Sequence, residues 1–385
     1  MGRFRDALAA RGLGAIAEVK RRSPSAGDLR PDADPAQLAA EFERAGAAAV
    51  SILVDERFGG RLADLHAARA AATLPLLAKG FFTEELQLLQ AKLAGADAVL
   101  LLLRDLDDAR AAAQLAYAHG LGLDALVEAH DAEELDRAIQ LDAQVIGVNA
   151  RNMTDFSVDR TTQVALVARA PRDRVVVAES GVTSRAQGAA AELAGADAVL
   201  VGTALMRASD PATKLRELLS RPLVKVCGLT QQDDVDVAVD AGADLLGFIL
   251  ARESPRRTDE LLAAPDSVLR VAVFVGERET TDADIVQFYA RENGHRARDG
   301  VLIRDDERVA TVIDLPWLDD DDTHLERARS TDGRVMLAGG LDSTNVRAAV
   351  DAVQPWAVDS ARSTELEPGI KDHEKVRAWV AAARS

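Results

Sequence analysis

Apolar and polar positions along the chain fall into blocks that predict buried strands, each followed by an amphipathic helix. One phrase occurs four times. In each copy a helix ends in glycine, a turn residue follows, and a run rich in Leu, Val or Ala begins. This pattern is typical of a helix that leads into a buried parallel strand. The copies are AGAAAVSIL from Ala45, AGADAVLLL from Ala94, AGADAVLVG from Ala194 and AGADLLGFI from Ala241.

The first part of the chain repeats this unit of strand and helix about eight times. Helices with apolar positions spaced by three and four lie between the runs, for example PAQLAAEFERAG and TEELQLLQAKLAG. About eight units in roughly 200 residues match one (β/α)8 barrel. We predict a first domain over residues 1–220 that ends in the helix DPATKLRELLS. Its predicted strands are Ala15–Lys20, Ala49–Val54, Leu76–Lys79, Ala98–Leu103, Ala125–Glu128, Val145–Asn149, Val175–Glu179 and Ala198–Val201.

A second series of apolar runs begins at RPLVKVCGLT. The 165 residues from 221 to 385 are few for a complete barrel. Within them, DGVLIRDDERVATVIDL fits either a β-hairpin that turns at RDDER or two parallel strands without their helix. We therefore predict an α/β protein of two tandem (β/α)8 TIM-type barrels, the second shortened or remodelled in its middle. Its runs are LVKVCG, DLLGFIL, LRVAVFV, DIVQFYA, RVATVIDL, RVMLAGG and WAVDSA.

Composition and charge limit the classes of function. Aromatic residues make up only 4% of the chain, so the cores must be built from Ala, Leu and Val. The net charge of -17 argues against a nucleic-acid surface. A single cysteine excludes internal disulfides and a cysteine-rich metal site. MGRFRDALAARGLG lacks an apolar signal core, and no apolar run is long enough to span a bilayer, so we expect a cytoplasmic enzyme without a membrane partner.

Ionisable and polar side chains recur at the carboxyl ends of the first domain's predicted strands, where the active site of a barrel lies. Any one of them alone is more often a solvated loop residue. A repeated set on one rim differs, because desolvation is costly unless the groups are paired or used. Lysines and carboxylates that face one cavity can perform acid–base chemistry. The set is Glu18, Lys20, Lys79, Glu128, Asn149, Arg151, Glu179 and Ser180.

A phosphate site is indicated at the last two strands of this domain. ESGV follows the seventh strand and LVGTALM contains the end of the eighth. They place Gly181, Gly202 and Thr203 where backbone N–H groups and a helix start bind a phosphate dianion. VGT alone is weak evidence, but its pairing with ESGV one unit earlier predicts a phosphorylated ligand.

The first 220 residues resemble the indole-3-glycerol phosphate synthase family through IAEVKRRSPSAG, SILVDERFGG, LLAKGFF, ALVEAHDAEELDRA, IGVNARNM, VAESGV and AVLVGTALMRASDP. The resemblance implies ring closure of a carboxyphenylamino-deoxyribulose phosphate to indole-3-glycerol phosphate, with loss of carbon dioxide and water and without a cofactor or metal. By position it implies Lys79 as the general acid at the carbonyl and Lys20 as a ligand of the substrate carboxylate or an assisting acid. Glu128 would be the base or the acid in dehydration.

The same resemblance implies the remaining contacts. Glu18, Asn149, Glu179 and Ser180 would line the cavity, Arg151, Phe58 and Phe81 would surround the aromatic ring, and Ser25, Gly181, Gly202 and Thr203 would bind the phosphate. The sequence departs from the family pattern in Gly80 and Ala150, where the family has Asp and Asn. Only 17 residues precede Glu18, where the family has a long helical extension over the substrate mouth.

The second half resembles phosphoribosylanthranilate isomerase, the family of the preceding reaction, through VKVCGLT, AGADLLGFIL, SPRR, VAVFVGE, ADIVQ, LAGGLDSTNV and EPGIKDHEKV. An Amadori rearrangement needs a base at the sugar C2 proton and an acid that opens the furanose ring. The resemblance implies Cys227 as the base, Arg256 as the ligand of the anthranilate carboxylate and Asp314 as the acid. A free cysteine also fits a packing role, but its place within KVCGLT favours chemistry.

The phosphate loop of the second half departs from its family. The chain has DSARSTE where the family has Ser-Ser-Gly after the last strand. Gly339 and Gly340 are the candidate backbone donors to a phosphate, and Arg362 is a candidate for a charge-assisted bond.

Three functions are compatible with these observations. The first, which we favour, is a bifunctional enzyme for two consecutive steps of tryptophan synthesis, acting on phosphorylated anthranilate sugars, with both domains packed in one monomeric chain. The second is a synthase with a non-catalytic carboxyl-terminal partner domain, which the short middle and the altered phosphate loop favour. The third is a barrel isomerase of the histidine-synthesis type, which typically uses paired aspartates at opposite strand ends and is disfavoured by the cysteine.

Overall fold

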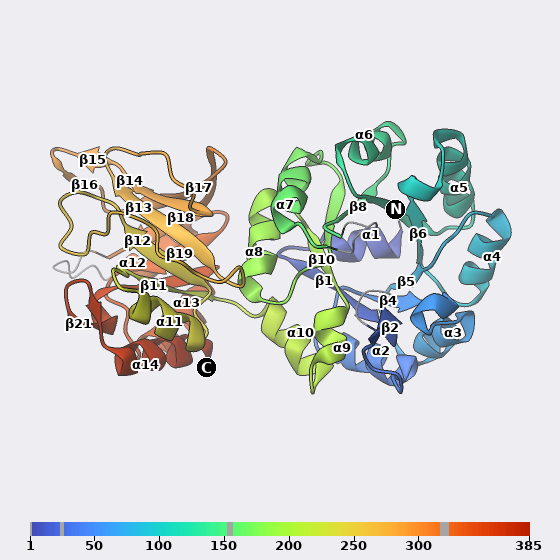
Figure 1. The fold of residues 1–385 in the computed structure, drawn as a ribbon, viewed down its shortest axis with the longest axis horizontal. Helices are drawn as coiled ribbons and strands as arrows, with labels where there is room; N and C mark the ends of the chain where they lie inside the picture. Colours follow the sequence, from blue (N-terminus) through green and yellow to red (C-terminus); the bar gives the residue numbers. More distant parts are fainter. Residues whose placement is uncertain (1, 24–26, 152–156, 316–322) are drawn as a thin grey trace. The chain divides into compact units, whose positions relative to one another are not determined.

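The computed structural model describes residues 2–23, 27–151, 157–315 and 323–385. The chain divides into two compact units, one of Met1–Thr183 with Ala191–Leu219 and one of Ser184–Ala190 with Ser220–Ser385. Each contains a closed barrel (Figure 1). Over the described part of the chain, none of the helices combines the length and the apolar character that a membrane span requires.

The first barrel is parallel throughout, and its strands follow one another around the ring in chain order. Eight strands close it within the described residues. The predicted strands are confirmed to within one residue at each end, and four of them coincide with the observed bounds. The strands are β1 (Gly14–Val19), β4 (Ala49–Leu53), β5 (Leu76–Lys79), β6 (Ala98–Leu102), β7 (Asp124–Ala129), β8 (Val145–Asn149), β9 (Val175–Glu179) and β10 (Ala198–Val201).

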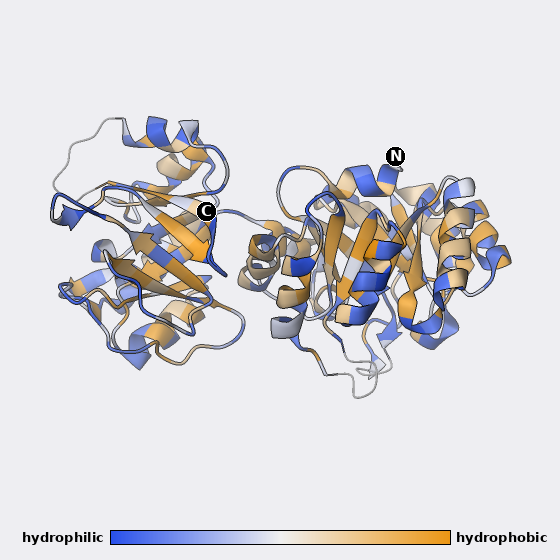
Figure 2. Cartoon of the chain, turned by 90° about the horizontal axis from the view of Figure 1, so that it is seen from above, coloured by the Kyte–Doolittle hydropathy of each residue, from blue (hydrophilic) through white to orange (hydrophobic). Residues whose placement is uncertain are grey.

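Helices and short segments connect these strands. The described helices are α1 (Arg3–Leu8), α2 (Pro35–Arg44), α3 (Leu62–Ala71), α4 (Glu85–Leu93), α5 (Asp108–Gly120), α6 (Ala132–Gln140), α7 (Arg160–Arg169), α8 (Arg185–Ala194), α9 (Thr203–Arg207) and α10 (Pro211–Leu219). The short segments are β2 (Arg22–Ser23), β3 (Gly27–Asp28), η1 (Glu56–Phe58) and η2 (Leu103–Asp105). Figure 2 shows the barrel strands mainly in hydrophobic colours and the helices in mixed ones, as expected when one helix face packs on the strands.

The glycines of the repeated AGA phrase end helices, as the sequence predicted. Gly46, Gly95, Gly195 and Gly242 all have positive φ, between 89° and 113°. Glycine adopts this left-handed conformation without the strain that a Cβ adds, so each helix ends there and the chain turns into the next strand.

The barrel register sets the polar strand ends side by side. Asn149 of β8 pairs with Glu179 of β9, and Lys79 of β5 pairs with Leu53 of β4. At the opposite end of the barrel, α1 places Phe4 and Leu8, both fully buried, against the apolar interior. Burying each such side chain contributes roughly 1.5–3 kcal/mol. The apolar end is thus closed, and the polar rim carries the chemistry.

The second barrel also closes through eight strands in the described residues, but one of them runs the other way. β17 pairs antiparallel with both of its neighbours. From Ile249 to Leu315, a stretch described throughout, the chain forms no α-helix. The barrel strands are β11 (Leu223–Cys227), β12 (Leu245–Ile249), β13 (Leu269–Val275), β14 (Ile285–Tyr289), β17 (Gly300–Arg304), β18 (Glu307–Asp314), β19 (Val335–Ala338) and β20 (Ala357–Ser360).

The hairpin interpretation of DGVLIRDDERVATVIDL is confirmed. β17 and β18 are joined through Asp305 and Asp306, whose φ angles are 48° and 63°. Aspartate tolerates this conformation better than most residues, and such a tight turn reverses the strand direction. The remaining described elements of this unit are α11 (Gln232–Asp240), β15 (Arg291–Glu292), β16 (His295–Arg296), α12 (His324–Ser330), α13 (Val346–Val353), η3 (Arg362–Thr364), β21 (Glu365–Glu367), β22 (Ile370–Lys371) and α14 (His373–Arg384).

Candidate active sites

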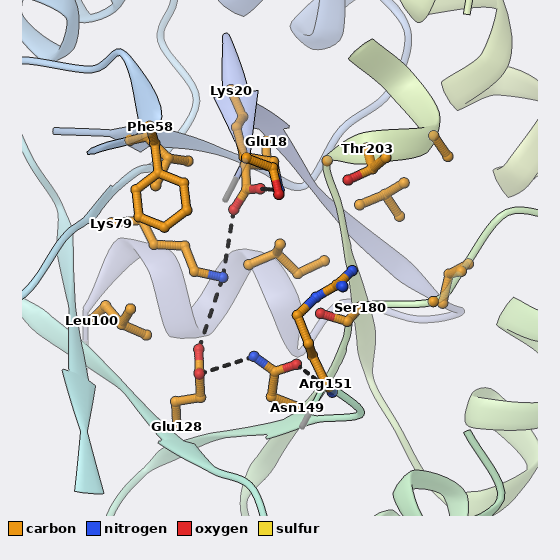
Figure 3. A pocket seen from close by; sticks show the side chains of 18 of the residues that line it. Glu18, Lys20, Phe58, Lys79, Leu100, Glu128, Asn149, Arg151, Ser180 and Thr203 are labelled. Atoms are coloured by element: carbon orange, nitrogen blue, oxygen red, sulfur yellow. Dashed lines mark hydrogen bonds and ion pairs between the residues drawn. The ribbon is translucent and has the colours of Figure 1, made fainter. Parts of the chain in front are cut away.

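Lys79 lies at the centre of the first barrel's rim, among three carboxylates. Figure 3 shows it between two of them, Glu18 and Glu128. Its Nζ is 2.6 Å from Glu179 Oε2, 3.5 Å from Glu18 Oε2 and 3.9 Å from Glu128 Oε2. Burial alone would lower the pKa of Lys79, but the three carboxylates outweigh it and raise that pKa well above its ordinary value. Lys79 is therefore a cation at neutral pH, held in place as a hydrogen-bond donor.

Glu18 joins the two lysines of the rim. Its Oε1 is 2.8 Å from Lys20 Nζ, while its Oε2 faces Lys79. Burial favours the neutral acid, but the charges of Lys20 and Lys79 prevail and lower the pKa of Glu18. Glu18 is thus an anion that fixes both ammonium groups at the mouth of the barrel.

Glu128 and Glu179 have opposite protonation tendencies although both are buried. Burial disfavours ionisation of Glu128, but His130, Lys79 and Asn149 lower its pKa to about 2. For Glu179, burial together with the charge of Glu128 raises the pKa to about 8, against the effect of Lys79. Two carboxyl groups whose pKa values are pushed apart can serve as base and acid in one site.

A cavity of about 310 Å³ lies over these groups. Phe58 and Phe81 form an apolar wall, with ring centroids 6.3 Å apart and an interplanar angle of 18°. Ser180 and Gly181 also line the cavity, and both have positive φ, 68° and 77°. Left-handed backbone at a serine is uncommon and often marks a functional turn. The cavity thus combines a wall suited to an aromatic ring with loops that present backbone groups.

The structure brings the predicted residues of this domain together, with two exceptions. Ser25 lies outside the described residues. Glu179 is fully buried and does not line the cavity, although it contacts Lys79 there. The predicted residues that line the cavity are Glu18, Lys20, Phe58, Lys79, Phe81, Glu128, Asn149, Arg151, Ser180, Gly181, Gly202 and Thr203.

Two further residues of this site, His130 and Gly147, were not predicted. His130 lines the cavity and is 3.0 Å from Glu128. Gly147 and Gly202 leave room for buried carboxylates: a Cβ at Gly147 would lie 2.2 Å from Glu179 Oε1, and one at Gly202 would lie 2.3 Å from Glu18 Oε1. His130 follows Glu128 by two residues in the sequence. It lies beyond the end of the strand, so an interpretation based on strand ends does not include it.

In the second barrel, Cys227 ends β11 and is buried. Lys225, two residues earlier and therefore on the same side of the strand, is completely buried, and its Nζ is 3.0 Å from Asp359 Oδ2. Burial raises the pKa of the Cys227 thiol, and the charge of Lys225 opposes that rise. Lys225 and Asp359 were not predicted as site residues.

Arg256 is held by a carboxylate of its own chain. Its Nε is 2.8 Å from Glu365 Oε1 and its Nη2 is 2.8 Å from Glu365 Oε2, a bidentate pair. Lys371 Nζ is 3.2 Å from the same Glu365 Oε1. The guanidinium is therefore fixed beside the end of β11, where a Cβ at Gly228 would meet it.

Asp314 ends β18 and accepts two hydrogen bonds. Tyr289 Oη donates to its Oδ2 over 2.9 Å and Arg296 Nη1 over 3.0 Å. Asp314 lines a cavity of about 510 Å³ together with Gly339, Gly340 and Arg362, as well as Asp359 and Arg296. Cys227 and Arg256 do not line it. Lys225, on the strand of Cys227, contacts Asp359, which lines this cavity.

A parallel barrel whose strand ends gather ionisable groups beneath a cavity defines the first unit as an enzyme of the TIM-barrel class. A sequence model described as "Indole-3-glycerol phosphate synthase" matches residues 2–218. The chain belongs to the indole-3-glycerol phosphate synthase family. A second model, described as "N-(5'phosphoribosyl)anthranilate (PRA) isomerase", matches residues 320–382. Both domains thus occur in one chain, as in a bifunctional enzyme of tryptophan biosynthesis.

Sequence relatives give the same picture. Indole-3-glycerol phosphate synthase 2 of Streptomyces coelicolor is 49% identical over 217 residues, which are 56% of this chain and 84% of that protein. The multifunctional tryptophan biosynthesis protein of Schizosaccharomyces pombe is 32% identical and aligns with 96% of this chain, which spans 59% of that protein. A phosphoribosyl anthranilate isomerase structure from Thermus thermophilus covers 41% of this chain and 96% of its own, at 26% identity and a TM-score of 0.34.

Proposed function

We propose that the first barrel closes the pyrrole ring of indole-3-glycerol phosphate through the Lys79 centre. The observation that carries this proposal is the single ammonium held among Glu18, Glu128 and Glu179 at the rim. As the ring carbon that bears the carboxylate attacks the C2 carbonyl, Lys79 gives a proton to the carbonyl oxygen. The carboxylate then leaves as carbon dioxide. In the dehydration, Lys20 as the assisting acid gives a proton to the new hydroxyl, which leaves as water, and Glu128 accepts the proton that substrate C1 loses.

The residues around this centre support the roles of binding groups. Lys20 is the candidate ligand of the substrate carboxylate, and the wall of Phe58 and Phe81 suits the aromatic ring. Gly181, Gly202 and Thr203 lie in the same cavity and are the candidate phosphate ligands. Phosphorylated anthranilate sugars combine a carboxylate, an aromatic ring and a phosphate, the three groups that this cavity accommodates.

For the second barrel we propose the preceding Amadori isomerisation. Cys227 would remove the C2 proton, Asp314 would protonate the ring oxygen, and Arg256 would bind the anthranilate carboxylate. The Lys225 ammonium beside Cys227 favours the thiolate that a base requires. Gly339, Gly340 and Arg362 line the cavity next to Asp314 and are the candidate phosphate ligands. The grouping of Asp314, Gly339, Gly340 and Arg362 at one cavity argues against a purely scaffolding role for the carboxyl-terminal half.

Two assays on the purified chain test the proposal. The carboxyphenylamino-deoxyribulose phosphate is supplied alone, and indole-3-glycerol phosphate is measured. Phosphoribosylanthranilate is supplied separately, and the loss of its fluorescence is followed. We expect both reactions. Turnover in the first assay alone would contradict the isomerase proposal and leave the synthase with a non-catalytic partner domain.

Gly147→Ala is expected to lower the kcat of the synthase reaction about 10- to 100-fold. The new Cβ would occupy the position of Glu179 Oε1, so the carboxylate must move away from Lys79. Misplacing a catalytic group by about 1 Å can cost about a hundredfold. The control is Gly120→Ala, because a Cβ at that helix position meets nothing within 4 Å. Equal activity of the two variants would show that Glu179 does not position Lys79.

The isomerase reaction is expected to accelerate as the pH rises from neutrality. Burial raises the pKa of the Cys227 thiol, so the fraction present as the thiolate base increases as the pH rises. The kcat/KM for phosphoribosylanthranilate, measured between about pH 6.5 and 9.5 around the cysteine pKa, should therefore rise toward the alkaline end. A profile that is flat over this range would count against Cys227 as the base.

A further inference from the structure

His130 lies between two carboxylates just beyond the end of β7. Its Nδ1 is 3.0 Å from Glu134 Oε2, and its Nε2 is 3.0 Å from Glu128 Oε1. The first contact is a hydrogen bond, and the second is an ion pair whose angle departs from that of a hydrogen bond. A neutral imidazole carries one N–H and can serve only one carboxylate. Carboxylates at both nitrogens therefore indicate a doubly protonated, cationic ring.

Helix α6 fixes the outer carboxylate of this chain of contacts. The helix begins after Asp131, whose side chain caps it by accepting a hydrogen bond from the backbone N–H of Glu134 over 2.9 Å. Glu134 lies in the first helical turn, where a negative charge is favoured. Its Oε2 also accepts the backbone N–H of His130 over 2.8 Å. Glu134 is thus held by the helix, and His130 is held by Glu134.

Glu128, the inner carboxylate, has one oxygen that accepts no hydrogen bond in the described part of the chain. Asn149 Nδ2 donates to Glu128 Oε1 over 2.9 Å, the same oxygen that faces His130. Glu128 Oε2 is buried and has no hydrogen-bond partner among the described residues, and Lys79 Nζ lies 3.9 Å from it. Because Glu128 lines the cavity and no described donor occupies Oε2, this oxygen is the candidate to accept a proton from a bound molecule.

We propose that His130 is a positioning residue of the synthase centre: clamped by Glu134, it holds Glu128 as a carboxylate whose Oε2 accepts no hydrogen bond from the described residues, and so makes Glu128 a base. The inference rests on the proposed synthase function. It decides between the two roles that the sequence left open for Glu128, base or acid, and it assigns a role to α6 outside the cavity.

The charges around the two groups support this assignment. Burial would lower the pKa of His130, but Glu128 and Glu134 raise it to about 10. Glu128 is faced by Lys79 from β5, which favours its ionised form, and by the carboxyl of Glu179 from β9, which opposes it. Arg104 and Arg151 line the same cavity and add positive charge on that side.

The first test compares His130→Asn and Glu134→Gln with the control Glu133→Gln, an exposed neighbour on the same helix turn. Asparagine keeps a hydrogen-bond donor but removes the ring charge. The readout is kcat against pH for ring closure of the deoxyribulose phosphate. Losing a neighbouring cation raises a carboxyl pKa by about one to three units, so the acid limb should move up by about one to two pH units in His130→Asn. In Glu134→Gln the ring is still protonated at acid pH, so the limb should move less. The loss of kcat in His130→Asn should shrink as the pH rises toward 8, because the role of His130 is exerted through the Glu128 pKa. Glu133→Gln should match wild type.

The second test does not depend on turnover. The imidazole signals of the full-length protein are titrated by NMR, and His130 is identified by its absence from His130→Asn. We expect a ring that stays doubly protonated at pH 8 and titrates at lower pH in Glu134→Gln. A His130 ring that titrates near the ordinary value of about 6.5 would overturn the inference. So would an equal loss of kcat at every pH, since that indicates a structural role alone. Absence of ring closure by the wild-type protein would instead contradict the synthase proposal, and the titration would still test the clamp.

Discussion

Replacing Lys79 with glutamine is expected to lower kcat for indole-3-glycerol phosphate formation by about three orders of magnitude. General acid catalysis contributes about 10²- to 10⁴-fold, and loss of one preorganised donor to a developing oxyanion costs about 10²- to 10³-fold. Glutamine can still donate a hydrogen bond but cannot deliver a proton. It also leaves Glu18, Glu128 and Glu179 without the ammonium that they share.

The same variant is expected to be less stable than wild type. Removing one partner of a buried ion pair costs about 3–5 kcal/mol, because a buried charge is left uncompensated. The carboxyl groups can take up protons at low pH, which reduces the uncompensated charge. The free energy of unfolding in urea should therefore fall less at pH 5 than at pH 8. The isomerase activity of the same sample shows whether the second barrel is folded. The control is Lys92→Gln on α4, which does not line the cavity. A synthase kcat within tenfold of wild type would contradict the role of Lys79.

Cys227→Ser is expected to remove isomerase activity by about a thousandfold while leaving synthase activity unchanged. A serine hydroxyl ionises far less readily than a thiol, so the variant lacks the base, which is worth about 10²- to 10⁴-fold. Serine is close in size to cysteine, and the tight space between Cys227 and Gly247, where a Cβ would lie 2.7 Å from Sγ, remains filled. Phosphoribosylanthranilate consumption and ring closure are measured on the same preparation. If Cys227 only packs, both rates should stay near those of wild type.

The fold could be predicted from local patterns where each strand and helix depends on its own residues. Ala198–Val201 coincides with β10, because Gly195 ends α8 and the apolar run that follows sets the bounds of the strand. The reversed strand β17 could not be chosen from sequence. Asp305 and Asp306 fit a solvated loop as well as a tight turn, and only the closure of the barrel decides between them.

The candidate site was predictable to the extent that it lies at strand ends. Parallel strands bring their carboxyl ends to one rim, so Lys79 and Glu128 were expected to meet there. His130 escaped prediction because its role depends on Glu134, which α6 presents from the next element. Arg256 and Glu365 are 109 positions apart, and no local pattern encodes such a pair.

The measurement that tests the central claim most directly is the product formed when phosphoribosylanthranilate alone is given to the purified chain. Two consecutive activities predict that indole-3-glycerol phosphate accumulates. The deoxyribulose phosphate should accumulate instead with Lys79→Gln, and unreacted substrate should remain with Cys227→Ser. Wild-type protein that leaves phosphoribosylanthranilate unchanged, while closing the ring of added deoxyribulose phosphate, would contradict the claim that one chain performs both reactions.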